Sequence, residues 1–169
     1  MKRLAAPLAI CLLAGPLVAQ SGTGSITGTL DLDPARWIVA SAGEGPTSTW
    51  TENDGRVEVR LVGTPDPEGD GGPGTLTIEM QVLAGPVEAR AIDARVELQR
   101  TDGTLVAGSE NVDLSLNAFQ STGGDLVLAG SVVATLTPDP TGGLVVDPQV
   151  GVTIDGNFQA TIRDEAGAN

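Results

Sequence analysis

The sequence predicts an all-β fold, an antiparallel β-sandwich of about ten strands that is immunoglobulin-like or jelly-roll-like. Three observations favour it. Apolar residues recur at every second position in most segments, which is the period of a strand with one buried face. Clusters of Gly, Pro, Asn and Asp separate these segments, and no segment has a sustained helical period. A closed soluble β-barrel made of the same strands is the alternative.

Residues 1–19 have the three parts of a secretory signal peptide. Lys2 and Arg3 form a basic start, an apolar stretch follows, and the small residue Ala19 precedes Gln20. We therefore expect a single all-β domain over 20–169 that is secreted, into the periplasm or the extracellular space, once the signal peptide is removed. No other apolar run approaches the roughly 20 residues of a membrane-spanning helix, so we expect no membrane span.

The composition from residue 20 onward is strongly acidic and lacks several reactive side chains. It contains no His, Tyr, Lys or Cys, because Lys2 and Cys11 lie in the predicted signal peptide. Seven arginines stand against 22 acidic residues, and this net charge of −15 disfavours nucleic acid and anionic lipid as partners. A secreted domain without cysteine is held together by its core, which is more typical of a bacterial protein than of a small eukaryotic one.

The first three predicted strands are separated by turns that contain Pro. Gly24–Leu32 alternates apolar or Gly residues with Ser, Thr and Asp, and Asp33-Pro34 ends it. Arg36–Ala40 is a short apolar run that includes Trp37, and a Gly-Pro turn leads from it into Thr47–Glu52.

A hairpin is predicted next. Asn53-Asp54-Gly55 tolerates the positive φ that tight hairpin turns need, and Arg56–Leu61 then alternates Val and Leu with Arg and Glu. Gly63–Gly74 is so rich in Gly and Pro that we expect an irregular loop. Thr75–Leu83 resumes the strict alternation of a strand.

Val87–Arg100 is predicted to be a strand with a β-bulge. Its apolar phase slips by one residue, because Ala89 and Ala91 are followed by Ile92 and Ala94. A helix is the less favoured alternative here, since Asp102-Gly103 is typical of a hairpin turn into a further strand at 104–107.

The last predicted strands include three that share a short pattern. The strands are Val112–Leu116, Asp125–Thr137, Leu144–Val146 and Val150–Ile162. Words of the form Gly, polar, large apolar, any, small, Thr, aliphatic begin at Gly24, Gly130 and Gly156. One interpretation is that β-rich sequences converge on such short patterns by composition alone. The alternative is that the three strands pack in similar ways and that a glycine makes room for a bulky neighbour.

The missing side chains argue against catalysis. Without His, Cys and Lys the domain cannot build a Ser-His-Asp triad, a Cys-His pair, a Schiff base or a His/Cys zinc site. A glycosidase-type pair of carboxylates remains, but dispersed acidic residues are usually solvated surface. We therefore expect that the protein is not an enzyme.

The two tryptophans are the candidate ligand-binding residues. Trp37 lies in an apolar run, where we expect a core position with its indole N–H bonded to a carbonyl. Trp50 lies among Thr and Ser, so an exposed platform that stacks on a sugar ring is an alternative to a core position.

The acidic loop contains one candidate metal site. Asp66, Glu68 and Asp70 alternate before Gly71, as in the first half of a calcium-binding loop of the EF-hand type. Thr77 stands where a bidentate Glu is required, so a flexible acidic loop is the alternative to a calcium site. No other cofactor is expected.

These observations predict a secreted, acidic bacterial β-sandwich that acts as a non-catalytic binding or structural module. Its partner is unknown, with a polysaccharide or another secreted protein as candidates. Two alternatives stay open, a glycan-binding or glycan-processing protein that uses Trp50, and a small soluble β-barrel that carries an apolar ligand. Any site is expected in the loops, chiefly at Thr64–Gly74.

Overall fold

The computed structural model describes residues 22–40, 47–69, 71–85, 88–138 and 151–163. These residues form ten strands and one short 3-10 turn, and all strand pairing is antiparallel. The elements are β1 (Gly22–Leu30), β2 (Asp33–Ala40), β3 (Thr49–Asn53), β4 (Arg56–Pro65), β5 (Gly74–Ala84), β6 (Ala89–Arg100), β7 (Gly103–Ala107), η1 (Ser109–Asn111), β8 (Val112–Thr122), β9 (Asp125–Pro138) and β10 (Val152–Arg163).

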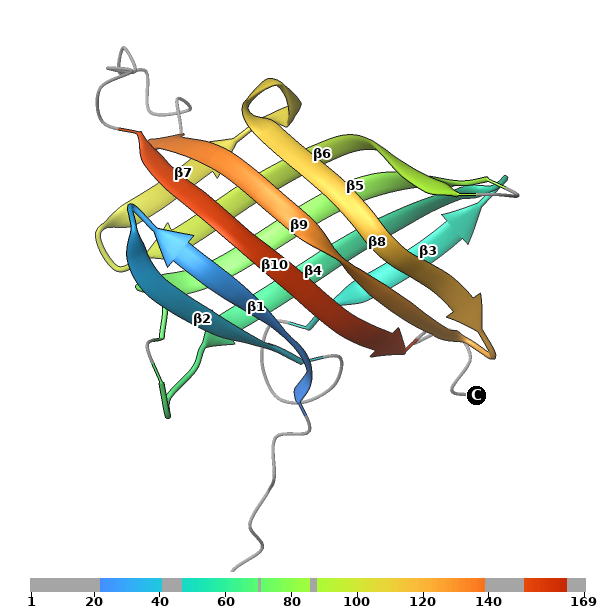
Figure 1. The fold of residues 1–169 in the computed structure, drawn as a ribbon, viewed down its shortest axis with the longest axis horizontal. Coiled ribbons are helices and arrows are strands. Elements are labelled where there is room, and N and C mark those ends of the chain that lie inside the picture. Colours follow the sequence, from blue (N-terminus) through green and yellow to red (C-terminus); the bar gives the residue numbers. More distant parts are fainter. Residues whose placement is uncertain (1–21, 41–46, 70, 86–87, 139–150, 164–169) are drawn as a thin grey trace, which may run out of the picture.

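The strands form two layers. β3, β4, β5, β6 and β7 make up one layer, which we name sheet 1, and β2, β1, β10, β9 and β8 make up sheet 2. In Figure 1 the strands of sheet 2 cross those of sheet 1 at a steep angle. Apolar side chains from both layers form one cluster between them, so the protein is the all-β sandwich that the alternation predicts.

Two short ladders join the layers at their corners. β2 pairs with β4 over three register positions, and β7 pairs with β9 over two, whereas every ladder within a sheet has at least five. The hydrogen bonding is therefore concentrated within the two sheets, and the fold is not an evenly closed barrel. Most strands pair with their neighbours in the chain, which is a meander, whereas immunoglobulin-like and jelly-roll sandwiches contain Greek keys.

A buried serine completes the corner at β4. The edge of β4 is shared, because β2 pairs with its last residues and β3 pairs with its first five. Between them, the fully buried Ser48 accepts a hydrogen bond from the backbone N–H of Val62 through its hydroxyl at 2.9 Å. The serine thus satisfies a buried donor that neither strand reaches, which would otherwise cost about 1–3 kcal/mol.

The three strands with the shared Gly pattern are neighbours in sheet 2. β10 lies between β1 and β9, and Phe158 on β10 stands opposite Ile26 on one side and Gly130 on the other. A Cβ atom added to Gly130 would lie 2.6 Å from Cζ of Phe158. The prediction that a glycine makes room for a bulky neighbour is therefore confirmed at Gly130.

Several strand boundaries differ from the prediction. β1 ends at Leu30, because Asp31 and Leu32 form a tight turn. β4 continues to Pro65 instead of ending before Gly63, because Gly63 lets β2 approach closely: a Cβ there would lie 2.7 Å from Cβ of Trp37. β8 also continues beyond Leu116, with a register shift between Leu116 and Ala118.

The β-bulge predicted in β6 is confirmed. Gln81 stands opposite Asp93 and Val82 stands opposite Ala91, so Ile92 is the extra residue. Ile92 was expected on the inner face and is instead 42% exposed, because the residue inserted at a bulge leaves the regular alternation. The predicted strand at Leu144–Val146 and the predicted signal peptide lie outside the described residues.

Candidate functional site

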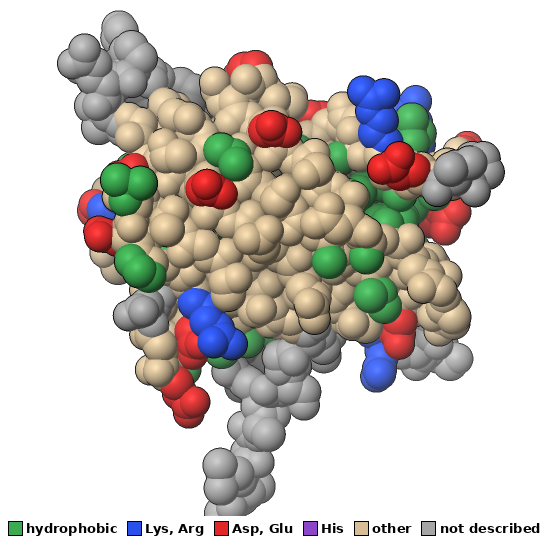
Figure 2. Space-filling view, in the orientation of Figure 1, with side chains coloured by type: hydrophobic (Ala, Val, Ile, Leu, Met, Phe, Trp, Pro, Cys, Tyr) green, Lys and Arg blue, Asp and Glu red, His purple; other side chains and the backbone are tan. Residues whose placement is uncertain are grey.

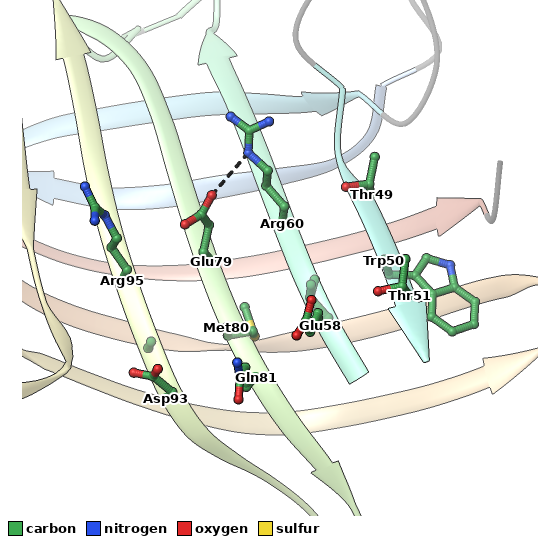
Figure 3. Close-up of a pocket in the computed structure, with 12 residues that line it drawn as sticks. Thr49, Trp50, Thr51, Glu58, Arg60, Glu79, Met80, Gln81, Asp93 and Arg95 are labelled. Carbon is green, nitrogen blue, oxygen red and sulfur yellow. Dashed lines mark ion pairs between the residues drawn. The ribbon is translucent and has the colours of Figure 1, made fainter. Parts of the chain in front are cut away.

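An open groove crosses the outer face of sheet 1. Its volume is about 530 Å³, and residues from β3, β4, β5 and β6 line it (Figure 3). Because the side chains of a strand alternate between its faces, the lining consists of two rows of outward side chains with an inward row beneath them. The first row is Thr49, Arg60, Glu79 and Arg95, the second is Thr51, Glu58, Gln81 and Asp93, and the inward row is Trp50, Val59, Met80 and Ala94.

The first row carries the positive charge of the groove. Nε of Arg60 lies 3.4 Å from a carboxylate oxygen of Glu79, and the guanidinium of Arg95 lies 3.7 Å from Glu97. About half of each of the Arg60, Glu79 and Arg95 side chains is exposed, so these ion pairs contribute little to stability. Both guanidinium groups retain N–H donors that a ligand can reach.

The second row is acidic and has no ion pair among the described residues. Glu58 and Asp93 are both exposed, and Gln81 stands between them on β5 (Figure 3). Three neighbouring strand spacings separate the outer strands β3 and β6, so the groove is roughly 14 Å long at about 4.8 Å per spacing. The groove therefore offers an extended ligand donors on one side and acceptors on the other.

The outer face of sheet 2 has a different character. Figure 2 shows that backbone and uncharged polar side chains cover most of this face. Ser131 on β9 and Ser115 on β8 form one of its cross-strand pairs, with their hydroxyl oxygens 3.0 Å apart. The charged groove and this largely uncharged surface lie on opposite sides of the sandwich.

Trp37 is a core residue, as predicted. It is 1% exposed, and its indole N–H donates a 2.8 Å hydrogen bond to the carbonyl of Gly74. Gly72 covers the ring so closely that a Cβ there would lie 2.2 Å from Cζ2 of Trp37. The tryptophan is thus enclosed between the sheet and the loop that follows β4, and its ring is not available to a ligand.

Trp50 is also buried, at 8% exposure. The alternative of an exposed stacking platform is therefore not what the structure shows, because β3 turns this side chain inward with Val59 opposite it. Its indole N–H has no hydrogen-bond partner in the described part of the chain. An unpaired buried donor of this kind costs about 1–3 kcal/mol.

The acidic loop is fastened to β2. Nε of Arg36 lies 3.2 Å from Oδ2 of the buried Asp66, and Oδ1 of Asp66 accepts the backbone N–H of Glu68 at 3.0 Å. The carbonyl of Arg36 accepts the N–H groups of Asp66 and Gly72, both at 3.2 Å. Asp66 is therefore a structural carboxylate that anchors the loop covering Trp37.

This arrangement gives no support to a calcium site. Within the described ranges no three His, Cys, Asp or Glu side chains gather in a way that would hold a metal ion. Both oxygens of Asp66 already have protein partners, the Glu68 side chain is exposed, and Asp70 lies outside the described residues.

The sequence alone does not predict the groove. Its charged residues are outward members of alternating strands, and such residues are normally solvated surface. Only the cross-strand register, which the sequence does not reveal, places Arg60 beside Glu79 and Glu58 in the same row as Asp93. One feature of the sequence points to the groove: side chains of opposite charge stand two positions apart on two strands, Glu58 with Arg60 and Asp93 with Arg95.

No protein-family model, curated protein or solved structure matches the chain. The described residues include no helix long and apolar enough to cross a membrane. The class of protein is therefore defined by fold and site alone, as an antiparallel β-sandwich with a charged groove across one sheet.

Proposed function

We propose that the chain is a secreted, non-catalytic binding module that holds a carbohydrate chain in the groove on sheet 1. The observation that carries the proposal is the groove itself, which presents two parallel rows of hydrogen-bonding side chains from four strands. Sugar hydroxyls both donate and accept, so they suit a surface where guanidinium donors face carboxylate and amide acceptors.

The side chains of the groove favour binding over catalysis. A glycosidase of the usual kind needs a carboxylic acid in a shielded pocket beside a second carboxylate. The carboxylates of Glu58, Glu79 and Asp93 are open to water, and Glu79 is also paired with Arg60. Their arrangement supports recognition of a polar surface without a general acid.

The glycan hypothesis no longer depends on the tryptophans, because both are buried. It rests on polar contacts, which contribute about 0.5–1.5 kcal/mol per neutral hydrogen bond. Several such bonds along one sugar chain are then required for appreciable affinity, and a roughly 14 Å groove across four strands provides space for them.

Affinity electrophoresis in gels containing soluble polysaccharides tests the proposal. We expect at least one polysaccharide to retard the mature protein. Gln81→Ile, which replaces the amide at the centre of the groove by an apolar side chain, should strongly reduce the retardation, and Gln159→Ile, on the exposed face of β10, should leave it unchanged. Equal retardation of both variants, or no retardation by any polysaccharide, would refute the proposal.

A further inference from the structure

The charged side chains that line the groove sum to a net charge of −1, with Glu58, Glu79 and Asp93 against Arg60 and Arg95. Arg56 and Arg90 stand in the next register row, beyond the acidic one. Arg60 and Arg95 each have a carboxylate partner within 4 Å, whereas Glu58 and Asp93 have no ion pair in the part of the chain that the structure describes. The remaining acidic residues of the chain add a field of the same sign, with a net charge of −13 over the full sequence. The two unpaired carboxylates and the net negative charge of the chain both attract a cationic group to the second row.

We infer that the ligand is an amino-sugar chain whose protonated amines meet Glu58 and Asp93, an inference that rests on the proposed carbohydrate-binding function. Glu58 on β4 and Asp93 on β6 are two strand spacings apart, roughly 9.6 Å at about 4.8 Å each. This separation is close to the two-ring repeat of an extended β-1,4-linked chain, so alternate amines can reach the two carboxylates. A charge-assisted bond of this kind is about twice as strong as a neutral one.

Gln81 and the arginine row complete the recognition. Gln81 lies between the two carboxylates, where its amide can bond to the intervening ring. Arg60 and Arg95, on the opposite row, can donate to hydroxyl or ring oxygens while they keep their carboxylate partners.

A basic peptide is the competing cationic ligand, but the groove suits it less. An extended peptide usually binds by adding a strand to a free sheet edge, with pockets for alternate side chains. The groove instead crosses the middle of the sheet, where the backbone groups of β4 and β5 are already paired on both sides. Along β4 and β5, the centre of the groove therefore offers side-chain contacts without an edge for strand addition.

Calorimetric titration with three hexamers tests the inference. Glucosamine, N-acetylglucosamine and glucose hexamers of the same β-1,4 linkage differ at the amine position. We expect the glucosamine hexamer to bind about tenfold or more tightly than the other two. Glu58→Gln and Asp93→Asn should each weaken its binding about tenfold, and Asp113→Asn, on the outer face of sheet 2, should not.

The possible results distinguish the preference for an amino sugar from the carbohydrate binding on which it rests. Equal binding of the three hexamers, weakened equally by Gln81→Ile, would overturn the amine preference and leave the carbohydrate groove in place. Hexalysine that binds as well as the glucosamine hexamer, and is equally sensitive to Glu58→Gln, would overturn the sugar as ligand. Binding that Asp113→Asn weakens as much as Asp93→Asn would show a general attraction of polycations to the acidic surface, which also contradicts the inference.

Discussion

Two hairpin turns of this protein have the same φ angles at their two central residues, but the second of these residues differs. Asp31 and Asp54 both have φ 51°, and the residues that follow them, Leu32 and Gly55, both have φ 76°. Glycine adopts this left-handed conformation without cost, whereas leucine is strained by roughly 1–2 kcal/mol. Leu32 is also 89% exposed, so no burial of its side chain offsets the strain.

This difference predicts that Leu32→Gly stabilises the protein by roughly 0.5–1 kcal/mol, since relief of strain exceeds the added entropy of the unfolded chain. The reverse exchange at the matched turn, Gly55→Leu, should destabilise it by about 1–2 kcal/mol. Urea denaturation of both variants measures the two changes. A loss of stability in Leu32→Gly would contradict the assigned strain.

Asp31 also ties its turn to β10. Its carboxylate accepts the backbone N–H of Thr153 at 2.8 Å, and its own N–H donates to the carbonyl of Thr153 at 2.9 Å. Hydrogen bonds to β10 therefore hold the turn in place, which explains how a leucine persists in a strained position. The sequence predicts the end of this strand at Asp33-Pro34, whereas the turn already lies at Asp31 and Leu32.

At the scale of elements, the packing of β10 against β9 depends on a large residue, Phe158, that faces a small one, Gly130. Phe158 is 2% exposed and faces Gly130, where a Cβ would lie 2.6 Å from the Phe158 ring and 2.1 Å from the carbonyl oxygen of Ser115. The ring therefore occupies the space that a side chain at Gly130 would fill. The second contact is with backbone, which cannot move aside without shifting β8.

We expect Phe158→Ala to lower the free energy of unfolding by about 3–5 kcal/mol, as for other buried aromatic residues. A loss below about 1 kcal/mol would contradict the burial of this ring.

Gly130→Ala supplies a second variant for the same contact. It should also destabilise, and the double variant with Phe158→Ala should still carry part of that cost, because Ser115 remains in the way. Chemical denaturation of the two single variants and the double variant gives the coupling between the positions.

At the scale of the whole molecule, electrostatics opposes folding. In four of the five ion pairs among the described residues both side chains are at least 32% exposed, so each of these pairs contributes little. The fifth, Arg36 with the buried Asp66, fastens one loop to β2. The full chain carries a net charge of −13, and a compact state with that charge repels itself. The core of the sandwich must therefore supply nearly all the stability.

We expect added salt to stabilise the protein, because screening weakens this repulsion more than it weakens exposed ion pairs. Raising NaCl from about 10 mM to about 500 mM should raise Tm by about 2–5 °C, which scanning calorimetry measures. Removing two carboxylates, with Asp113→Asn and Asp155→Asn, should reduce this salt dependence. A fall in Tm with salt would show that the ion pairs outweigh the repulsion.

The sequence by itself determined the kind of elements and their inner faces. Alternation identified Leu76, Ile78 and Met80 as one buried row of β5, and Asp54-Gly55 marked a hairpin, because strand period and turn chemistry are local properties of the chain. The apolar context of Trp37 likewise predicted its burial, and the phase slip before Ile92 predicted the bulge.

Only the tertiary structure decided where the groove lies. Glu58, Gln81 and Asp93 are far apart in the chain and share a row only because three strands pair in one register. The pairing of β3 with β4 turned Trp50 inward, and the contacts of Arg36 fastened the acidic loop over Trp37. Register and loop docking depend on contacts between distant segments, so local pattern cannot specify them.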